Sequence, residues 1–236
     1  MAEKRSSFSG KLGFVLASAG SAVGLGNIWR FPYLAAKYGG GIFLLVYLLL
    51  AVTFGFALMC AEIAIGRKTG TSALGAYKKL DKRFGFIGTI ASLVPVIILP
   101  YYSVIGGWIA KYFYTFVSGG ISEATSDGFF GNFISSPVEP VIWFSIFLGL
   151  TALVVLFGVE KGIEKVSKFM MPVLVALTIF IAVYAMLMPG ALEGVKYYLT
   201  PDFSKFSVTT VLAAMGQLFY SMSLAMGIMI TYGSYM

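Results

Sequence analysis

Three glycines, Gly20, Gly24 and Gly26, stand close together in an otherwise apolar segment near the N-terminus. Glycine destabilises a helix interior by about 1 kcal/mol relative to alanine, so this segment predicts a helix that is interrupted. At membrane depth, unwound backbone persists only where it is buried in protein or lines a cavity. The free amides, carbonyls and opposed helix ends of such a break are suited to bind a small zwitterion together with its cations.

A second apolar segment, near the C-terminus, carries a similar interruption. Residues 216–227 contain hydroxyls, an amide and glycines where a lipid-facing helix would carry leucine and valine, and the polar side chains include Gln217, Ser221 and Ser223. Two interrupted helices, one opening each half of a transporter, are the best sequence indication of its binding site. The two segments therefore predict one site built from both.

The composition places these segments in a membrane. Hydrophobic residues make up 58% of the chain and charged residues 11%, and the mean hydropathy is +0.88. A soluble domain of 236 residues has no core large enough for that apolar content. A membrane span needs about 20 apolar residues. Six candidate spans follow, at residues 12–36, 41–66, 86–117, 138–158, 169–188 and 209–232.

The basic residues predict the orientation of the spans. Of the 17 lysines and arginines, 12 fall in three groups on one side: Lys4, Arg5 and Lys11, then Arg67, Lys68, Lys78, Lys79, Lys82 and Arg83, then Lys161, Lys165 and Lys168. By the positive-inside rule this side is the cytoplasm, so we expect a multi-pass protein of the cytoplasmic membrane with both termini of the chain inside. The net charge of +7 reflects this topology and contact with anionic lipid, and gives no reason to expect nucleic acid.

The residues for enzyme chemistry are missing from the sequence. It has no histidine, and its single cysteine, Cys60, lies inside the second expected span. With no pair of nucleophile and base and no set of metal ligands, we expect no enzyme. Between the spans, residues 67–85 predict an amphipathic helix at the cytoplasmic surface. Residues 118–137 and 189–208 predict outer loops with short helical pieces.

Several motifs resemble those of the neurotransmitter:sodium symporters, and the resemblance runs over essentially the whole chain. They are residues 22–32, Gly39 to Phe43, Glu62 with Gly66 and Arg67, Tyr101 and Tyr102 before Trp108, and Gly216 and Gln217 with Ser221, Ser223, Thr231 and Tyr232. The resemblance implies an all-α, leucine-transporter-like inverted-repeat fold. Residues 1–188 would form the first five helices, and residues 189–236 an outer loop and helix 6, with helices 1 and 6 unwound at mid-membrane.

The resemblance also implies a substrate site. The substrate carboxylate would meet the amides near Leu25 and Gly26 and the hydroxyl of Tyr102. The positive end of a helix dipole favours an anion at that place. The substrate amine would meet carbonyls and a hydroxyl, which come from Ala22, Tyr220, Ser221 and Ser223.

Two sodium sites follow from the same resemblance. One would use the carbonyl of Ala22, the amide oxygen of Asn27 and the hydroxyl of Ser221, together with the substrate carboxylate. The other would use the carbonyls of Gly20 and Val23. All are hard oxygen ligands, which suit an alkali cation. The sequence leaves open whether the transporter uses chloride, because Tyr47, Gln217 and Ser221 would suit a protein with or without a chloride site.

Two positions bear on the choice of substrate. Monoamine members of the family carry an aspartate where this chain has Gly24, so glycine leaves room for a substrate that brings its own carboxylate. Met226 stands where leucine-selective relatives have a phenylalanine, and a flexible thioether can yield to a larger ring. We therefore expect a neutral amino acid with a large apolar or aromatic side chain.

Other residues have a gating or supporting role by resemblance and a plain alternative beside it. Arg30 belongs to the outer gate or is a snorkelling interface residue. Arg5 belongs to the inner gate or only sets orientation. Tyr102 and Tyr220 form a lid over the site or are ordinary aromatic packing. A glutamate such as Glu62 is costly in hydrocarbon, which favours a functional role. By resemblance, Glu62 supports the unwound part of helix 6, and Gln217 likewise has a gating or supporting role.

Length is the departure from the family pattern, because family members have about twice as many helices. We expect this chain to be the N-terminal half of a symporter whose C-terminal half is missing. The complete protein would carry sodium and the amino acid by alternating access. The alternative is a non-transporting truncated fragment or a membrane assembly subunit.

Overall fold

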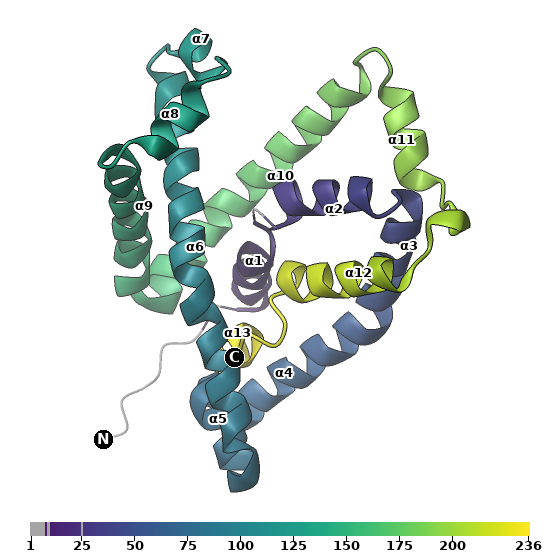
Figure 1. The fold of residues 1–236 in the computed structure, drawn as a ribbon. Helices are drawn as coiled ribbons and strands as arrows, with labels where there is room; N and C mark the ends of the chain where they lie inside the picture. The colour runs from purple at the N-terminus through teal and green to yellow at the C-terminus, as the bar shows by residue number, and fades with distance from the viewer. Residues whose placement is uncertain (1–7, 9, 25) are drawn as a thin grey trace. The chain divides into compact units, whose positions relative to one another are not determined.

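The computed structural model describes residues 8, 10–24 and 26–236 (Figure 1). These residues are almost entirely helical and form no strand; the one β contact among them is an isolated bridge between Gly40 and Pro201. The chain divides into two compact units. The first comprises Met1–Ser92 and Glu164–Met236, and the second comprises Leu93–Ile163.

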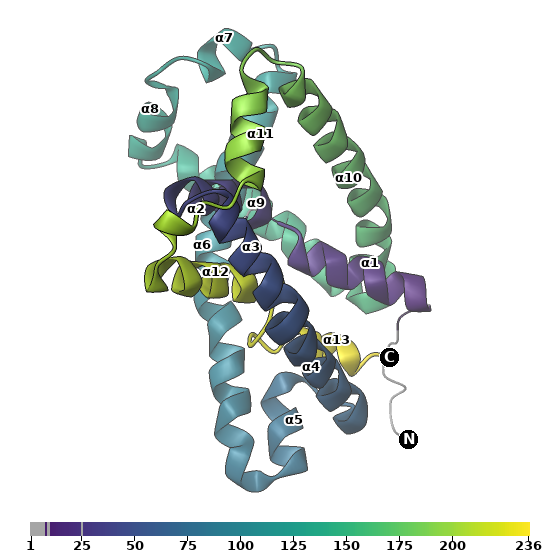
Figure 2. The same cartoon turned by 90° about the vertical axis from the view of Figure 1, so that its right-hand side faces the viewer.

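The first unit contains both interrupted helices. Its elements are α1 (Lys11–Ala22), η1 (Gly26–Arg30), α2 (Phe31–Lys37), α3 (Gly41–Leu50), η2 (Ala51–Gly55), α4 (Phe56–Thr69), α5 (Ala73–Leu80), η3 (Lys82–Phe84), the start of α6 (Gly85–Val117), α10 (Lys165–Met186), α11 (Ala191–Leu199), η5 (Phe203–Lys205), α12 (Val208–Ser221) and α13 (Ile228–Gly233). Figure 2 shows α1 meeting the lower part of α10, and the two helices are in contact.

The core of the first unit lies where α2, α3 and α12 meet. Phe43 and Ala214 are fully buried there, and Leu34 packs with them. The ring of Phe31 contacts the rings of Phe43 and Tyr47 edge to face, with centroids 5.6 and 4.8 Å apart. Such pairs add about 0.5 to 1.5 kcal/mol beyond the area they bury. This core fixes the outer halves of both interrupted helices.

Glycine allows α13 to pack closely along α4. A Cβ on Gly233 would lie 2.6 Å from the carbonyl oxygen of Ile63, and a Cβ on Gly66 would overlap the carbonyl oxygen of Ile230. Any larger residue at these positions would push the helices apart. The inner half of the second interrupted helix is therefore fixed against α4.

The second unit contains the rest of α6, then α7 (Ile121–Ala124), α8 (Phe129–Ser135), α9 (Glu139–Leu156) and most of η4 (Val159–Glu164). Lys111 of α6 forms an ion pair with Glu139 at the start of α9. The ring of Trp108 contacts that of Phe130 edge to face, with centroids 5.1 Å apart. These contacts join α8 and α9 to the outer half of α6.

The expected spans agree with the helices in most places. In the part of the chain that the structure describes, four helices are long and apolar enough to cross a membrane, Gly41–Thr69, Lys82–Val117, Glu139–Leu156 and Val159–Met186, and a fifth is added if the bent pair Lys11–Ala22 and Gly26–Lys37 is one span. The fifth expected span begins ten residues earlier than the sequence indicated, because η4 continues into α10. The sixth is broken, and α12 alone is too short to cross. The amphipathic helix expected in residues 67–85 is α5.

Candidate functional site

The first break follows α1. Helix α1 ends at Ala22, Val23 has extended backbone with φ −88° and ψ 110°, and the next helical turn, η1, begins at Gly26. The axes of Lys11–Ala22 and Gly26–Lys37 differ by 53°. A Cβ on Gly24 would meet no atom within 4 Å, whereas a Cβ on Gly26 would overlap the ring of Tyr220. Gly24 therefore borders open space, and Gly26 permits close packing.

The second break separates α12 from α13. Ser223 and Ala225 have positive φ values of 53° and 59°, and Gly227 has a φ of 71°. A left-handed conformation costs a non-glycine residue about 1 to 2 kcal/mol, so this stretch is strained. Strain of this kind persists only where surrounding contacts over-determine the conformation.

Glu62 of α4 supplies one of those contacts. Its side chain is 3% exposed, and its Oε1 accepts a hydrogen bond from the amide of Ala225 at 2.7 Å. Its Oε2 is buried and has no hydrogen-bond partner among the described residues. Burial raises the pKa of Tyr77 on α5, and the negative charge of Glu62 raises it further, so Tyr77 lies within electrostatic reach of this carboxylate.

Hydrogen bonds join the two breaks directly. Ser223 Oγ donates to the carbonyl oxygen of Ser21 at 3.0 Å. Gln217 is fully buried, and its Nε2 donates to the carbonyl oxygen of Gly26 at 2.7 Å and to Ser221 Oγ at 2.9 Å. Gln217 Oε1 is buried without a partner in the described part of the chain. These bonds link the end of α1, the start of η1, the end of α12 and the second break.

Three of the residues predicted to bind sodium, Ala22, Asn27 and Ser221, are hydrogen-bonded at the two breaks. Asn27 Nδ2 donates to the carbonyl oxygen of Ala22 at 2.9 Å, so the side chain of Asn27 spans the first break. A carbonyl oxygen has two lone pairs and can accept this bond and still face a cation. Ser221 is buried, and Gly20 is half-buried beside Ser167 of α10. Val23 is 36% exposed. Within the described ranges, no three His, Cys, Asp or Glu residues are grouped as a transition-metal site would need.

The outer side of the breaks carries an aromatic ring and a cation. The guanidinium carbon of Arg30 lies 5.2 Å from the centroid of the Tyr220 ring, a cation–π distance. A Cβ on Gly26 would approach Cε1 of this ring to 2.6 Å, so the ring lies between Gly26 and Arg30. Met226 is half-buried in the second break. Arg30, Tyr220 and Gly26 thus lie together, and the gating role of Arg30 and the substrate contacts of Tyr220 and Met226 stay predictions.

Three predicted residues are not placed at the site. Leu25 and Arg5 lie outside the described residues. Tyr102 belongs to α6 in the second unit, where it is half-buried and its ring contacts that of Tyr101 at 6.0 Å. Its contact with a substrate stays a prediction.

Sequence reasoning missed the contact between α1 and the start of α10. Glu164 is 1% exposed and pairs with Lys168 at 2.5 Å. A Cβ on Gly13 would overlap the carboxylate of Glu164, and a Cβ on Gly20 would lie 3.0 Å from Ser167 Oγ. The small residues Gly13, Ala17 and Gly20 recur at helical spacing and are the signal that could have identified this face of α1.

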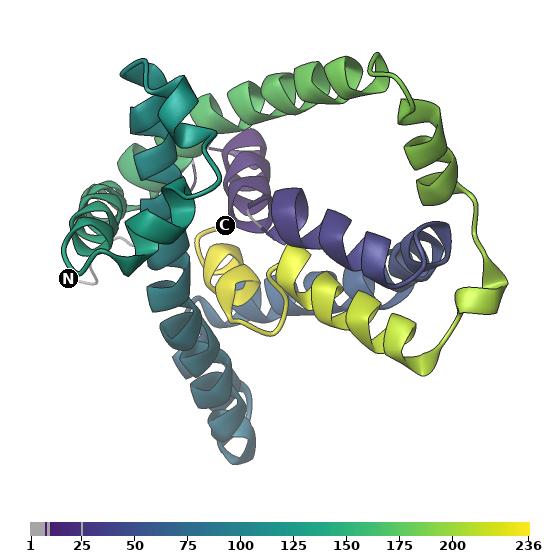
Figure 3. The same ribbon diagram turned by 45° about the horizontal axis from the view of Figure 1, so that its top comes forward.

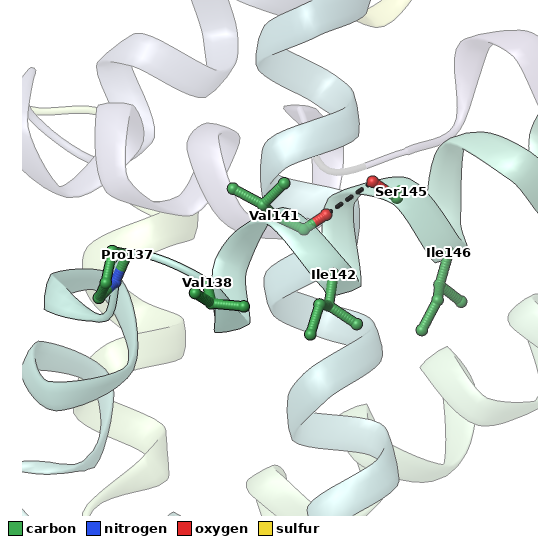
Figure 4. A pocket seen from close by; sticks show the side chains of 6 residues that line it. All are labelled: Pro137, Val138, Val141, Ile142, Ser145 and Ile146. Atoms are coloured by element: carbon green, nitrogen blue, oxygen red, sulfur yellow. Dashed lines mark hydrogen bonds between the residues drawn. The ribbon is translucent and has the colours of Figure 1, made fainter.

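Two apolar grooves elsewhere lack the groups that a zwitterion needs. One runs along α9 and is lined by Pro137, Val138, Val141, Ile142, Ser145 and Ile146 (Figure 4). The hydroxyl of Ser145 donates to the carbonyl oxygen of Val141, so it is already bonded. The other lies along α3, and its side chains are apolar except for Thr53, which donates to Leu49. Neither groove offers the unwound backbone and buried polar side chains that the two breaks share.

Comparison with known proteins defines the class of this chain. The model of the sodium:neurotransmitter symporter family matches residues 5–126 and 134–236, and the chain belongs to this family. It is therefore a multi-pass membrane protein of a family of secondary transporters, which are not enzymes.

Individual relatives agree with this assignment. The chain is 41% identical to the uncharacterized sodium-dependent transporter YhdH of Bacillus subtilis, over 99% of this chain and 53% of the relative. It is 42% identical to the uncharacterized sodium-dependent transporter MJ1319 of Methanocaldococcus jannaschii, over 99% and 50%. It is 33% identical to the sodium-dependent neutral amino acid transporter B(0)AT3 of Rattus norvegicus, over 99% and 43%. The chain thus spans about half the length of the curated relatives it matches.

A solved structure confirms the fold. The crystal structure of MhsT in complex with L-phenylalanine superposes with a TM-score of 0.91 at 40% identity, over 98% of this chain and 54% of MhsT. The all-α, leucine-transporter-like fold expected from the sequence is therefore confirmed. The division into residues 1–188 and 189–236 concerns the internal repeat and stays a prediction.

Proposed function

We propose that these residues form the part of a symporter in which sodium and a neutral amino acid bind together and cross the cytoplasmic membrane by alternating access. The observation that carries the proposal is the joining of the two breaks by Ser223 with Ser21 and by Gln217 with Gly26. Unwound backbone from two helices meets at one place, where its carbonyls and amides face partners other than lipid.

The substrate carboxylate would bind at the start of η1. The amides of Leu25 and Gly26 would face it, and the positive end of the η1–α2 helix favours an anion. Gly24 supports an amino-acid substrate because open space borders it and no side chain competes with the carboxylate. The amine would bind the carbonyls of Ala22, Tyr220 and Ser221 and the hydroxyl of Ser223.

Sodium would bind on both sides of the first break. Ala22, Asn27 and Ser221 would supply oxygens for one ion, and the substrate carboxylate would complete its shell. Gly20 and Val23 would supply carbonyls for the second ion. Because one ion shares the substrate carboxylate, binding of sodium and binding of the amino acid reinforce each other. This shared ligand couples the inward sodium gradient to substrate uptake.

The relatives support a neutral amino acid as the substrate class. The rat relative is named a neutral amino acid transporter, and MhsT was crystallised with L-phenylalanine. Met226, half-buried in the second break, offers a flexible wall for a large apolar or aromatic side chain. We therefore propose a substrate of that size.

The basic residues support a cytoplasmic position for both ends of the chain, as the positive-inside rule predicts. A second half that resembles the remaining part of the relatives would supply the missing sodium ligands and bury the open faces of the broken helices. The binding partners are thus the amino acid, sodium, lipid and this second half, and chloride stays open.

Uptake by the full-length protein in proteoliposomes tests the proposal. A large neutral amino acid should accumulate with an inward sodium gradient and fail to accumulate when choline replaces sodium. Equal uptake in choline would contradict symport. Residues 1–236 alone, measured in the same assay, test the alternative of a non-transporting fragment or assembly subunit, since that alternative predicts no uptake by these residues on their own.

A further inference from the structure

The last turn of α11 and the residues that follow it lie against the turn that connects α2 to α3. We call residues 197–205 the outer strap. Gly40 and Pro201 form a β-bridge, and a Cβ on Gly41 would lie 2.8 Å from the backbone nitrogen of Pro201. A Cβ on Gly39 would lie 3.0 Å from Cβ of Lys205. The three successive glycines therefore form the surface on which the strap packs.

Tyr197 links the strap to the end of α2. Its hydroxyl donates to the carbonyl oxygen of Ala36 at 2.9 Å, and the carbonyls in the last turn of a helix lack partners within the helix. The ammonium of Lys205 lies 5.2 Å from the centroid of the Tyr197 ring, which stacks the two ends of the strap on each other. The strap is thus closed on itself and bonded to α2.

The other end of the strap leads directly into α12. Ser207 caps α12 by accepting a hydrogen bond from the amide of Thr210 at 3.1 Å. The carboxylate of Asp202 accepts bonds from the amide and hydroxyl of Ser204, which fixes the turn at η5. Short, bonded connections of this kind leave little freedom between Lys205 and the first turn of α12.

At their other ends, the same two half-helices are joined by the bond from Gln217 to Gly26 and by the packing of Tyr220 on Gly26. Helix α2 and helix α12 run alongside each other between these two connections, and α11 approaches the outer end of α3 beside them (Figure 3). Both outer half-helices are therefore connected at the site and again at the outer end.

We propose that the outer strap makes α2 and α12 move as one body, and that Tyr197 is the positioning residue that sets their spacing. This inference rests on the proposed function, because alternating access requires the outer half-helices to open and close over the site. Without the strap, α2 and α12 would open independently of each other. The proposed ligand oxygens of the two interrupted helices would then no longer keep a fixed distance from one another.

A distance measurement between spin labels tests the proposal in the full-length transporter. Labels at Tyr33→Cys on α2 and Leu212→Cys on α12, which are 59% and 57% exposed, are placed in a background with Cys60→Ser and every other cysteine replaced. Pulsed dipolar spectroscopy then gives the α2–α12 distance distribution in sodium and in choline. The parent should give one narrow distribution that is the same in both.

Two variants weaken the strap, and each has a matched control. Tyr197→Phe removes one hydrogen bond and should increase the population at longer distance by about 2- to 10-fold. Gly40→Ala should increase this population further, because its Cβ would lie 2.7 Å from Cε1 of Tyr197 and because Gly40 has a φ of +61°. The controls are Tyr184→Phe, exposed on α10, and Gly194→Ala on α11, where an added Cβ meets nothing within 4 Å. Both controls should keep the parent distribution.

The proposal is overturned if Tyr197→Phe leaves the distribution as narrow as in the parent, or if the parent distribution itself changes between choline and sodium. Tyr197→Phe is a mild change, so it decides the matter even where Gly40→Ala does not fold. Failure of the proposed function is a different result. In that case uptake is independent of sodium while Tyr197→Phe still widens the distribution, and the strap remains.

Discussion

The carboxylate oxygen Oε1 of Glu62 accepts a hydrogen bond from the amide of Ala225 at 2.7 Å, and this bond joins α4 to the break between α12 and α13. Ala225 is left-handed with a φ of 59°, so its amide points away from any helical partner. The carboxylate supplies the acceptor that the strained backbone needs. Its other oxygen is buried without a partner among the described residues, so one acceptor of the carboxylate is in use.

The first prediction separates the acceptor of Glu62 from its charge. Glu62→Gln keeps an oxygen facing Ala225 and should leave most of the free energy of unfolding in place. Glu62→Leu leaves the amide of Ala225 without its charged acceptor and should lower the free energy of unfolding by about 1 to 3 kcal/mol. Thermal unfolding of the full-length protein in detergent measures both. Glu193→Gln, exposed on α11, is the control.

If Glu62→Gln is as unstable as Glu62→Leu, then the charge of Glu62 is required and the account based on its acceptor is wrong. If neither variant loses stability, the hydrogen bond to Ala225 does not stabilise the break.

The second prediction concerns the sodium ligands. Ser221→Ala removes a hydroxyl proposed to bind sodium and also removes an acceptor of Gln217 Nε2. We expect the sodium concentration for half-maximal substrate binding to rise about tenfold, comparable to the loss of one hydrogen bond to a charged group. Asn27→Asp should raise this sodium concentration as well, because the Nδ2 that donates to the carbonyl oxygen of Ala22 is lost. Scintillation proximity binding at varied sodium measures the shift.

Ser145→Ala is the matched control, since this hydroxyl only donates to Val141 on α9. An unchanged sodium requirement in both Ser221→Ala and Asn27→Asp would remove these residues from the cation site.

The breaks themselves were predictable because their cause is local. Clustered glycines at 20, 24 and 26 and the polar residues after Gly216 weaken helices wherever they stand. In the structure α1 ends at Ala22 and η1 begins at Gly26, and the second break lies between Ser221 and Ile228, as expected. The positive φ of Ser223 and Ala225 had no such local signal, since neither residue type favours that conformation.

Contacts between distant residues were not predictable in the same way. Gln217 bonds to Gly26 across 191 residues, and Tyr197 bonds to Ala36 across 161. Periodicity identifies the buried face of a helix but not the helix that covers it. The resemblance to the family supplied the pairing of the two breaks. It did not supply Glu164 beneath Gly13, or the glycine turn beneath the outer strap.

The third prediction concerns Tyr102, whose role at the site is a proposal. If its hydroxyl donates to the substrate carboxylate, Tyr102→Phe removes a charge-assisted hydrogen bond worth about 1.5 to 3 kcal/mol. Substrate affinity should then fall about tenfold to a hundredfold. Tyr101→Phe, exposed on the same helix, is the control. Equal affinity in Tyr102→Phe and the parent would favour aromatic packing as the role of Tyr102.

The last prediction uses the contrast between two neighbouring glycines. A Cβ on Gly24 meets nothing within 4 Å, so Gly24→Ala should leave the free energy of unfolding within about 0.5 kcal/mol of the parent. The same change at Gly26 places a Cβ 2.6 Å from Cε1 of Tyr220 and should destabilise the protein by about 1 to 3 kcal/mol. Thermal unfolding of the full-length protein distinguishes the two.

At Gly24, substrate affinity should change although stability does not, because the proposed substrate carboxylate occupies the open space beside it. Gly24→Ala should reduce amino-acid affinity although the fold is intact. Gly24→Asp should abolish binding, because two carboxylates close together in a site of low dielectric repel each other. Competition binding with a large neutral amino acid measures both variants. Full affinity in a stable Gly24→Asp variant would show that the substrate carboxylate binds elsewhere and that the open space beside Gly24 is not part of the substrate site.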